Sequence, residues 1–214
     1  VDRAEQYSNV DGDWTDTRRY YIEQDFSPSR IRSTQVGGEL GETNTGDPQT
    51  LVDFATWTIE NYPAERYALI IWNHGGSWYG AASDDSAGGD ELSLPEIDDA
   101  LREINARTGI GSFDLIGFDA CLMGGLEIYQ TVAPYGEYAV ASAELVPGNG
   151  WFYEEMIFAL QDDPTMDGKA FGQVIVDSFM TFYNEIRSNY DVFSMSVADL
   201  QFIDDLDEAL FNFK

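Results

Sequence analysis

The sequence predicts an α/β protein whose central sheet is largely parallel and covered by helices on both faces. Two apolar runs of strand length, YALIIW (67–72) and FDLIGF (113–118), lack the polar alternation of a strand with one solvated face. Segments with helical spacing of apolar residues alternate with such runs. The 214 residues are 43% hydrophobic, enough for one substantial core. We therefore expect a single domain over 1–214.

The first half of the chain contains one predicted strand at 19–22 and two predicted helices. Asp47 suits the N-cap and Pro48 the first position of a helix that ends before Pro63. Its expected buried stripe is Leu51, Phe54, Ala55, Thr58 and Ile59. Ser93 and Glu96 have capping-box spacing before the second helix, which Gly109 ends. The inner face of that helix is expected to be Leu94, Ile97, Leu101 and Ile104.

The second half continues the alternation of strands and helices. The apolar spacing predicts strands at 138–142 and 192–197. It predicts helices over 122–132, 151–160 and 168–188 and a short final helix. Reactive groups in such a fold lie in loops at the carboxyl ends of the strands.

Composition excludes several classes of function. Asp and Glu number 39 against 11 Lys and Arg, and the net charge of −28 repels nucleic acid and anionic lipid. Cationic partners such as basic peptides or metal ions are favoured, although the charge also suits a surface adapted to high salt. The apolar runs are too short to span a membrane. One Cys and one His permit neither an intrachain disulfide nor a zinc motif.

His74 and Cys121 are the only residues of their types, and each directly follows an apolar strand. The chain between them is long enough for a crossover helix, so neighbouring parallel strands would bring imidazole and thiol together. Cysteine catalysis needs such a pair, because His generates or stabilises the attacking thiolate. A helix starting just after Cys121 would favour the thiolate through its dipole. The alternatives are a buried small hydrophobic Cys and a turn-forming His.

The flanking residues suit the same chemistry. Gly75 leaves its backbone N–H unshielded, and the N–H of Cys121 is a second donor. Two such donors could bind the oxyanion of a tetrahedral intermediate.

The segments YALIIWNHGGSWYG and FDLIGFDACLMGGLEIYQ resemble the His and Cys motifs of clostripain-like cysteine peptidases, a family of the caspase-like fold clan. The resemblance continues through GDPQTLVDFATW and ASAELVPGNGWFYEEMI and covers most of 11–160. It implies a caspase-like α/β/α sandwich and an endopeptidase with a His74/Cys121 dyad that requires no third member. It also implies peptide or protein substrates cleaved after basic residues.

The resemblance assigns Asp119 to the floor of the pocket for the basic side chain, where a carboxylate could pair with Arg or Lys. The alternative is that Asp119 caps the following helix or holds the loop. Glu144 is the candidate for a second acidic pocket residue. Asn149 occupies a position where an acid is expected, so the choice between Arg and Lys stays open.

Three further expectations concern activation, metal and completeness. The loop 75–91 contains no Lys or Arg, unlike the processed loop of family members, so we expect no self-cleavage there. Asp84, Asp85, Asp90 and Glu91 crowd this loop, and their oxygens suit Ca²⁺, although the proposed reaction requires no cofactor. The resemblance implies that the family's first strand–helix unit is absent from this chain. Either a separate N-terminal fragment, a candidate partner, supplies the unit, or the unit lies outside the given sequence and an edge strand is exposed.

Two other functions remain open on the same fold. One is a non-catalytic domain that binds a basic peptide or a cation in its acidic pocket. The other is a peptide ligase that transfers the acyl group from Cys121 to an amine. We expect a secreted or cell-surface protein whose signal sequence is not in this chain.

Overall fold

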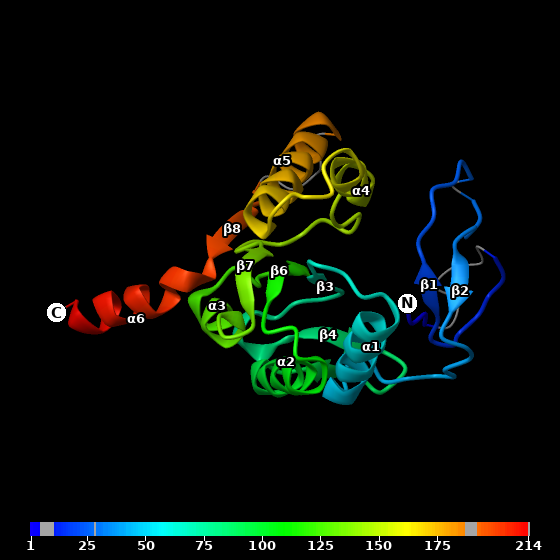
Figure 1. Ribbon diagram of the computed structural model, residues 1–214, viewed down its shortest axis with the longest axis horizontal. Coiled ribbons are helices and arrows are strands. Elements are labelled where there is room, and N and C mark those ends of the chain that lie inside the picture. Colours follow the sequence, from blue (N-terminus) through cyan, green and yellow to red (C-terminus); the bar gives the residue numbers. More distant parts are fainter. Residues whose placement is uncertain (5–10, 28, 187–191, 214) are drawn as a thin grey trace.

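Four strands form the central sheet, in the order β3-β6-β7-β8. The computed structural model describes residues 1–4, 11–27, 29–186 and 192–213 (Figure 1). The first three strands are parallel, whereas β8 runs antiparallel to β7. The bounds of the four strands are β3 Ala68–Trp72, β6 Phe113–Asp119, β7 Gly136–Ala141 and β8 Ser196–Asp199. The sheet is therefore largely parallel, as the sequence predicts.

Helices cover both faces of this sheet (Figure 1). One face is covered by α1 (Pro48–Asn61), α2 (Leu94–Thr108) and α3 (Leu126–Val132). The other face is covered by α4 (Tyr153–Asp162) and α5 (Gly168–Ile186). The result is an α/β/α sandwich.

Strand β6 contributes side chains to the cores on both faces of the sheet. Ile116 and Phe118 pack in the core beneath α1, α2 and α3, while Leu115 packs in the core beneath α4 and α5. Gly117 lies on the same face as Leu115, and a Cβ there would be 2.7 Å from the ring of Trp151. Because side chains alternate along a strand, Asp119 also faces the α4–α5 layer.

The two helix starts predicted from capping residues are confirmed. The Asp47 side chain accepts a hydrogen bond from the Gln49 N–H at 2.8 Å, and Pro48 opens α1. Ser93 and Glu96 form the reciprocal capping box of α2. Gly109 ends α2 with φ +68°, a left-handed conformation that glycine adopts without steric cost. The four apolar residues expected on the inner face of α2 are all buried.

The stripe predicted for α1 is partly wrong. Its buried residues are Val52, Ala55 and Thr56, whereas Phe54 is exposed. Arg19 of β1 (Arg19–Tyr21) lies over the Phe54 ring at 5.8 Å and over Trp57 at 4.8 Å. The aromatic face of α1 thus contacts a cation rather than the core. β1 pairs with β2 (Thr34–Val36) in an antiparallel hairpin at one end of the molecule (Figure 1).

Several element boundaries also differ from prediction. The last strand is Ser196–Asp199 rather than 192–197, and the strand expected at 138–142 begins at Gly136. The end of the helix expected at 168–188 lies outside the described residues. A short 3₁₀ turn, η2 (Leu200–Phe202), leads into the final helix α6 (Ile203–Asn212), which extends away from the sheet (Figure 1).

The segment that follows β3 is folded rather than an open loop. It contains the 3₁₀ turn η1 (Ser77–Tyr79) and an antiparallel hairpin of β4 (Ala81–Asp84) and β5 (Asp90–Leu92). The turn is closed by hydrogen bonds from Ala82 N–H to the His74 carbonyl at 3.0 Å and from Gly76 N–H to the Gly80 carbonyl at 2.9 Å. These bonds fix the backbone on which His74 is mounted.

Candidate active site

The loops of His74 and Cys121 meet at one edge of the sheet. β3 and β6 are parallel neighbours in which Trp72 pairs with Asp119, and each candidate residue follows its strand end by two positions. Gly75 packs so tightly against the second loop that a Cβ there would be 2.2 Å from the Cys121 carbonyl oxygen. The structure therefore brings the two loops together, as the sequence predicts.

The Cys121 thiol contacts the backbone of the segment after β7. The Val146 N–H donates to the Cys121 Sγ at 3.3 Å, and the Val146 carbonyl lies 3.7 Å from the same sulfur. The thiol is partly buried and is not in a disulfide. Sequence reasoning missed Val146, because its contribution comes from the peptide group and an apolar side chain gives no signal for it.

The helix expected immediately after Cys121 is not there. Leu122 has φ +62°, and α3 begins only at Leu126. Instead of starting a helix, the N–H groups of Leu122 and Gly124 donate across to the carbonyls of Glu144 and Ser142, at 3.1 and 2.7 Å. The expected contribution of a helix dipole at Cys121 is therefore wrong. A peptide N–H of the neighbouring segment faces the sulfur instead.

Two backbone donors in these loops are free. Within the described residues, neither the Gly75 N–H nor the Cys121 N–H donates a hydrogen bond. His74 is exposed, and its ring makes no hydrogen bond to any part of the chain that the structure describes. The site thus offers an accessible imidazole, a thiol and two unused N–H groups.

Asp119 is a buried carboxylate at the end of β6, two residues before Cys121. Only 2% of the residue is exposed. Its Oδ2 accepts hydrogen bonds from the Trp151 N–H and from the Tyr153 hydroxyl, both at 2.9 Å. Its Oδ1 is buried and has no hydrogen-bond partner in the described part of the chain. A buried acceptor without a donor is costly, and among the buried side-chain atoms without a partner in the described residues Asp119 Oδ1 is the one that belongs to a carboxylate.

The surroundings of Asp119 affect its ionisation. Burial raises the pKa of Asp119, and the hydrogen bonds from Trp151 and Tyr153 act in the opposite direction. Burial and the adjacent Asp119 carboxylate raise the pKa of Tyr153, so its hydroxyl stays protonated and donates. Sequence reasoning missed both donors, although the quoted stretch GNGWFYEEMI contains them. Their distance from Asp119 along the chain hides the contact.

Glu144 and Asn149 lie on the same segment after β7, and both are exposed. The Glu144 backbone binds Leu122, one residue beyond Cys121, while no contact of its carboxylate with Asp119 is found among the described residues. Asn149 lies in a turn closed by the Gly150 N–H and the Pro147 carbonyl at 2.8 Å. The Gly150 backbone, at φ +67°, packs on Asp119 so closely that a Cβ would be 2.6 Å from Oδ2.

Two serines hold the segment after β7 in place. The Ser142 Oγ donates to the Glu144 carbonyl at 2.8 Å and lies 3.2 Å from the Ser194 Oγ. The Ser194 Oγ also accepts from the Ala143 N–H at 3.1 Å. From the other side, the Tyr183 hydroxyl of α5 donates to the Gly150 carbonyl at 2.8 Å. The backbone that contacts both Cys121 and Asp119 is thus itself hydrogen-bonded on both sides.

The acidic side chains of the loop 75–91 are largely engaged by the protein. Asp84 is buried and accepts from the Thr45 N–H at 2.8 Å and the Ala87 N–H at 3.0 Å. Asp90 accepts from the Asn44 side-chain amide at 2.6 Å, and Asp85 is exposed. The carboxylates near enough to share one cation, within the described residues, are Asp2, Glu42 and Asp84. Neither Asp85 nor Asp90 belongs to that group.

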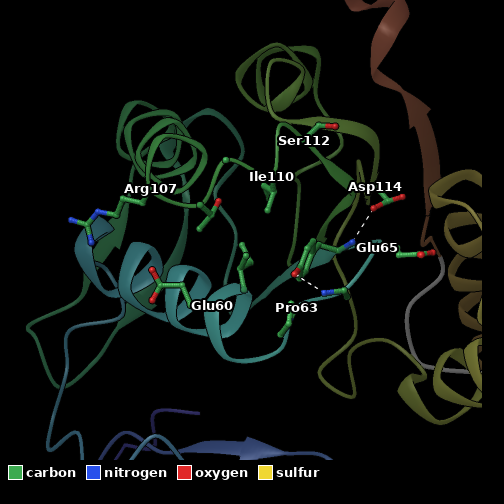
Figure 2. Close-up of a pocket in the computed structure, with 12 residues that line it drawn as sticks. Glu60, Pro63, Glu65, Arg107, Ile110, Ser112 and Asp114 are labelled. Atoms are coloured by element: carbon green, nitrogen blue, oxygen red, sulfur yellow. Dashed lines mark hydrogen bonds between the residues drawn. The ribbon is translucent and has the colours of Figure 1, made fainter.

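A separate pocket lies at the opposite edge of the sheet (Figure 2). Its volume is about 420 Å³, and it is lined in part by Glu60, Glu65, Arg107 and Asp114. Asp114 is near the start of β6, whereas Cys121 follows its end. The Asp114 carboxylate accepts from the Tyr67 N–H at 2.8 Å and forms an ion pair with Arg66 at 3.2 Å. These contacts join the starts of β3 and β6, away from the candidate site.

A model of the clostripain family, peptidase family C11, matches residues 23–213. The chain belongs to the clostripain family. Clostripain of Hathewaya histolytica is 32% identical in an alignment of 205 residues, and the match covers 79% of this chain and 38% of clostripain. The chain thus spans well under two thirds of the length of this relative.

Two solved structures of C11 proteases share the fold. A secreted C11 cysteine protease from Bacteroides thetaiotaomicron, solved with an irreversible peptide inhibitor, has a TM-score of 0.72 and 20% identity over 91% of this chain and 55% of its own. An inactive zymogen C11 protease from Parabacteroides distasonis has a TM-score of 0.68 and 22% identity over 92% of this chain and 52% of its own. The predicted caspase-like α/β/α class is confirmed. None of the described helices has the length and apolar character to cross a bilayer.

Proposed function

We propose that this chain is the catalytic part of a cysteine endopeptidase that cleaves peptide bonds after basic P1 residues. The observation that supports this most strongly is the pairing of β3 with β6, which places the only imidazole and the only thiol of the chain on touching loops. Membership of the clostripain family agrees with this chemistry.

In the proposed reaction, the Cys121 sulfur attacks the carbonyl carbon of the scissile bond and forms a tetrahedral oxyanion. His74 accepts the thiol proton and delivers it to the leaving amine as the C–N bond breaks. A water molecule then attacks the thioester, His74 takes its proton, and the thiol is regenerated as the acid product leaves. The His74 ring is exposed and makes no hydrogen bond within the described residues, so it is free to approach a bound substrate.

The N–H groups of Gly75 and Cys121 are the proposed oxyanion donors. Neither group donates a hydrogen bond within the described residues, and the Gly75 backbone packs against the Cys121 carbonyl oxygen. Preorganised peptide donors of this kind stabilise the transition state because they need no reorganisation during the reaction.

Asp119 is the proposed partner of the basic P1 side chain. Its buried Oδ1 lacks a donor in the described chain, and a bound cation would supply one. Glu144 and Asn149 are proposed to lie along the same substrate path, on the segment whose backbone contacts both Cys121 and Asp119.

The remaining expectations are also proposals. We propose that the reaction needs no cofactor. Because Asp85 and Asp90 do not join Asp84 in a group that could share one cation among the described residues, a Ca²⁺ ion is proposed instead at Asp84 with Asp2 and Glu42, where melting curves with Ca²⁺ and with EGTA would detect it. The outer edge of β3 has no partner among the described strands, so a further strand, supplied by a separate fragment, could pair there. Secretion is proposed by analogy with the secreted neighbour.

Turnover of a fluorogenic peptide with Lys or Arg at P1 tests the proposal. Wild type should hydrolyse it and Cys121→Ala should not; equal turnover by both proteins would end the idea. Binding of the peptide by calorimetry without turnover, together with no alkylation of Cys121 by iodoacetamide at neutral pH, would indicate a binding domain. An amide product formed with an added amine would indicate a ligase.

A further inference from the structure

The two carboxylate oxygens of Asp119 differ in what they can still bind. Oδ2 already accepts two hydrogen bonds, from the Trp151 N–H and the Tyr153 hydroxyl, and the Gly150 backbone packs against it. Oδ1 is buried and accepts none within the described residues. Since each carboxylate oxygen has two acceptor sites, Oδ2 is saturated and only Oδ1 remains for a substrate.

This asymmetry bears on the choice between lysine and arginine. A guanidinium binds a carboxylate best in a bidentate arrangement that uses both oxygens. An ammonium is a compact charge that is satisfied by one oxygen. With Oδ2 occupied, Asp119 can offer an arginine only one of its two oxygens.

We infer that Tyr153 is a specificity-determining residue that, by occupying Oδ2 of Asp119, makes this site accept a lysine at P1 at least as well as an arginine. The inference rests on the proposed function and adds the P1 preference to it. Asn149 is consistent with it, because this neutral residue stands where an acid is expected and adds no second charge for a guanidinium.

The Tyr153 hydroxyl can be removed without disturbing the other contacts of the site. Tyr153 is the first residue of α4. The residue is 39% exposed, and its ring stacks beside that of Trp151 with centroids 6.4 Å apart. Tyr153→Phe keeps this ring and leaves the Trp151 N–H bond to Oδ2. It frees one acceptor site on Oδ2, which allows bidentate binding of a guanidinium.

The experiment compares two fluorogenic peptides that differ only in Lys or Arg at P1. We expect wild type to give a ratio of kcat/KM, Arg over Lys, of about 1 or less, and Tyr153→Phe to raise the ratio about tenfold, because one charge-assisted hydrogen bond is gained by Arg alone. Tyr135→Phe is the matched control. It removes a hydroxyl that donates to the Asp98 carboxylate at 2.8 Å, outside the site, and should leave the ratio unchanged.

The outcomes separate the inference from the function on which it rests. Turnover with a wild-type ratio clearly above 1, or with a ratio that Tyr153→Phe does not change, overturns the inference and leaves the peptidase intact. No turnover of either peptide overturns both. If Tyr153→Phe does not fold, the inhibition constants of two small cations are measured on wild type instead. Pentylamine should inhibit at least as tightly as pentylguanidine. Tighter inhibition by pentylguanidine refutes the inference.

Discussion

Trp72 and Asp119 are paired residues of the parallel strands β3 and β6, so His74 and Cys121 each lie two positions beyond the same rung of the sheet. Backbone pairing, rather than any side-chain contact, thus places the two candidate catalytic residues. The loops beyond that rung touch at Gly75, which abuts the Cys121 carbonyl.

The contact at Gly75 predicts a sharp difference between two adjacent glycines. Gly75→Ala would put a Cβ 2.2 Å from the Cys121 carbonyl oxygen and force the two loops apart. We expect kcat/KM to fall about a hundredfold and stability to drop by about 1–3 kcal/mol. In Gly76→Ala, the new Cβ meets the Tyr79 Cβ at 3.4 Å and the Gly80 carbonyl oxygen at 3.7 Å, which are ordinary van der Waals distances, so activity and melting temperature should be close to wild type. Equal effects of the two substitutions would show that the close approach is unimportant.

Asp119→Asn should change how stability depends on pH. Burial raises the native pKa of Asp119 above its ordinary 3.8, so the folded state binds this proton more tightly than the unfolded state. The free energy of unfolding of wild type therefore falls as pH rises from 3.8 through the raised native pKa, and this loss is absent from the variant. Across this range, the melting temperature of the variant relative to that of wild type should increase as pH rises. A difference that is constant or shrinks with rising pH would be inconsistent with a buried, ionising carboxylate.

Ser194→Ala tests whether the hydroxyl pair positions the nucleophile loop. In the variant, the Ala143 N–H loses its acceptor and the Ser142 hydroxyl loses its contact with Ser194. Ala143 directly precedes Glu144, whose carbonyl accepts from the Leu122 N–H in the nucleophile loop. We expect kcat to fall about tenfold, because small misplacements of reacting groups are costly. Ser178→Ala, which removes a hydroxyl within α5 that donates to the Ile175 carbonyl, is the control and should keep full activity. A kcat for Ser194→Ala equal to that of the control would show that the hydroxyl pair does not position the nucleophile loop.

The loop 75–91 should not be cut by the active protein. It has no Lys or Arg, and hydrogen bonds to buried Asp84 hold its turn. Ala87→Arg introduces a basic residue at the exposed tip of the β4–β5 hairpin, where we expect slow self-cleavage that the double variant Ala87→Arg/Cys121→Ala does not show. Intact-mass spectrometry distinguishes these proteins. A cut within 75–91 in the wild type would disprove the expectation.

Local signals predicted most of the scaffold. Asp47, Ser93, Glu96 and Gly109 fixed helix ends correctly because capping depends on neighbouring residues. Phe54 was misplaced because its partner, Arg19, comes from another part of the chain. The helix expected at 122 failed for the same reason: the N–H groups of Leu122 and Gly124 bond to the segment after β7 rather than along a helix.

The candidate site likewise contains features that local sequence signals predict and features that depend on distant parts of the chain. The close approach of the His74 and Cys121 loops could be predicted, because the ends of apolar strands are visible in the sequence. The role of Asp119 came from the family resemblance and stays a prediction. The donors to Asp119 and to the Cys121 sulfur could not be predicted, since Val146, Trp151 and Tyr153 reach them only after the segment beyond β7 folds back across the strand ends. Two of these three donors are peptide N–H groups, whose role cannot be inferred from the type of residue.

The most direct test of the account is covalent trapping of the nucleophile. Wild type is incubated with a peptidyl chloromethylketone that has a basic P1 residue, digested, and mapped by mass spectrometry. We expect one adduct, on Cys121, that forms in step with the loss of peptidase activity, forms much more slowly in His74→Ala, and does not form in Cys121→Ala. Complete loss of activity with Cys121 unlabelled, or an adduct that forms equally fast without His74, would refute the assignment of the two catalytic residues.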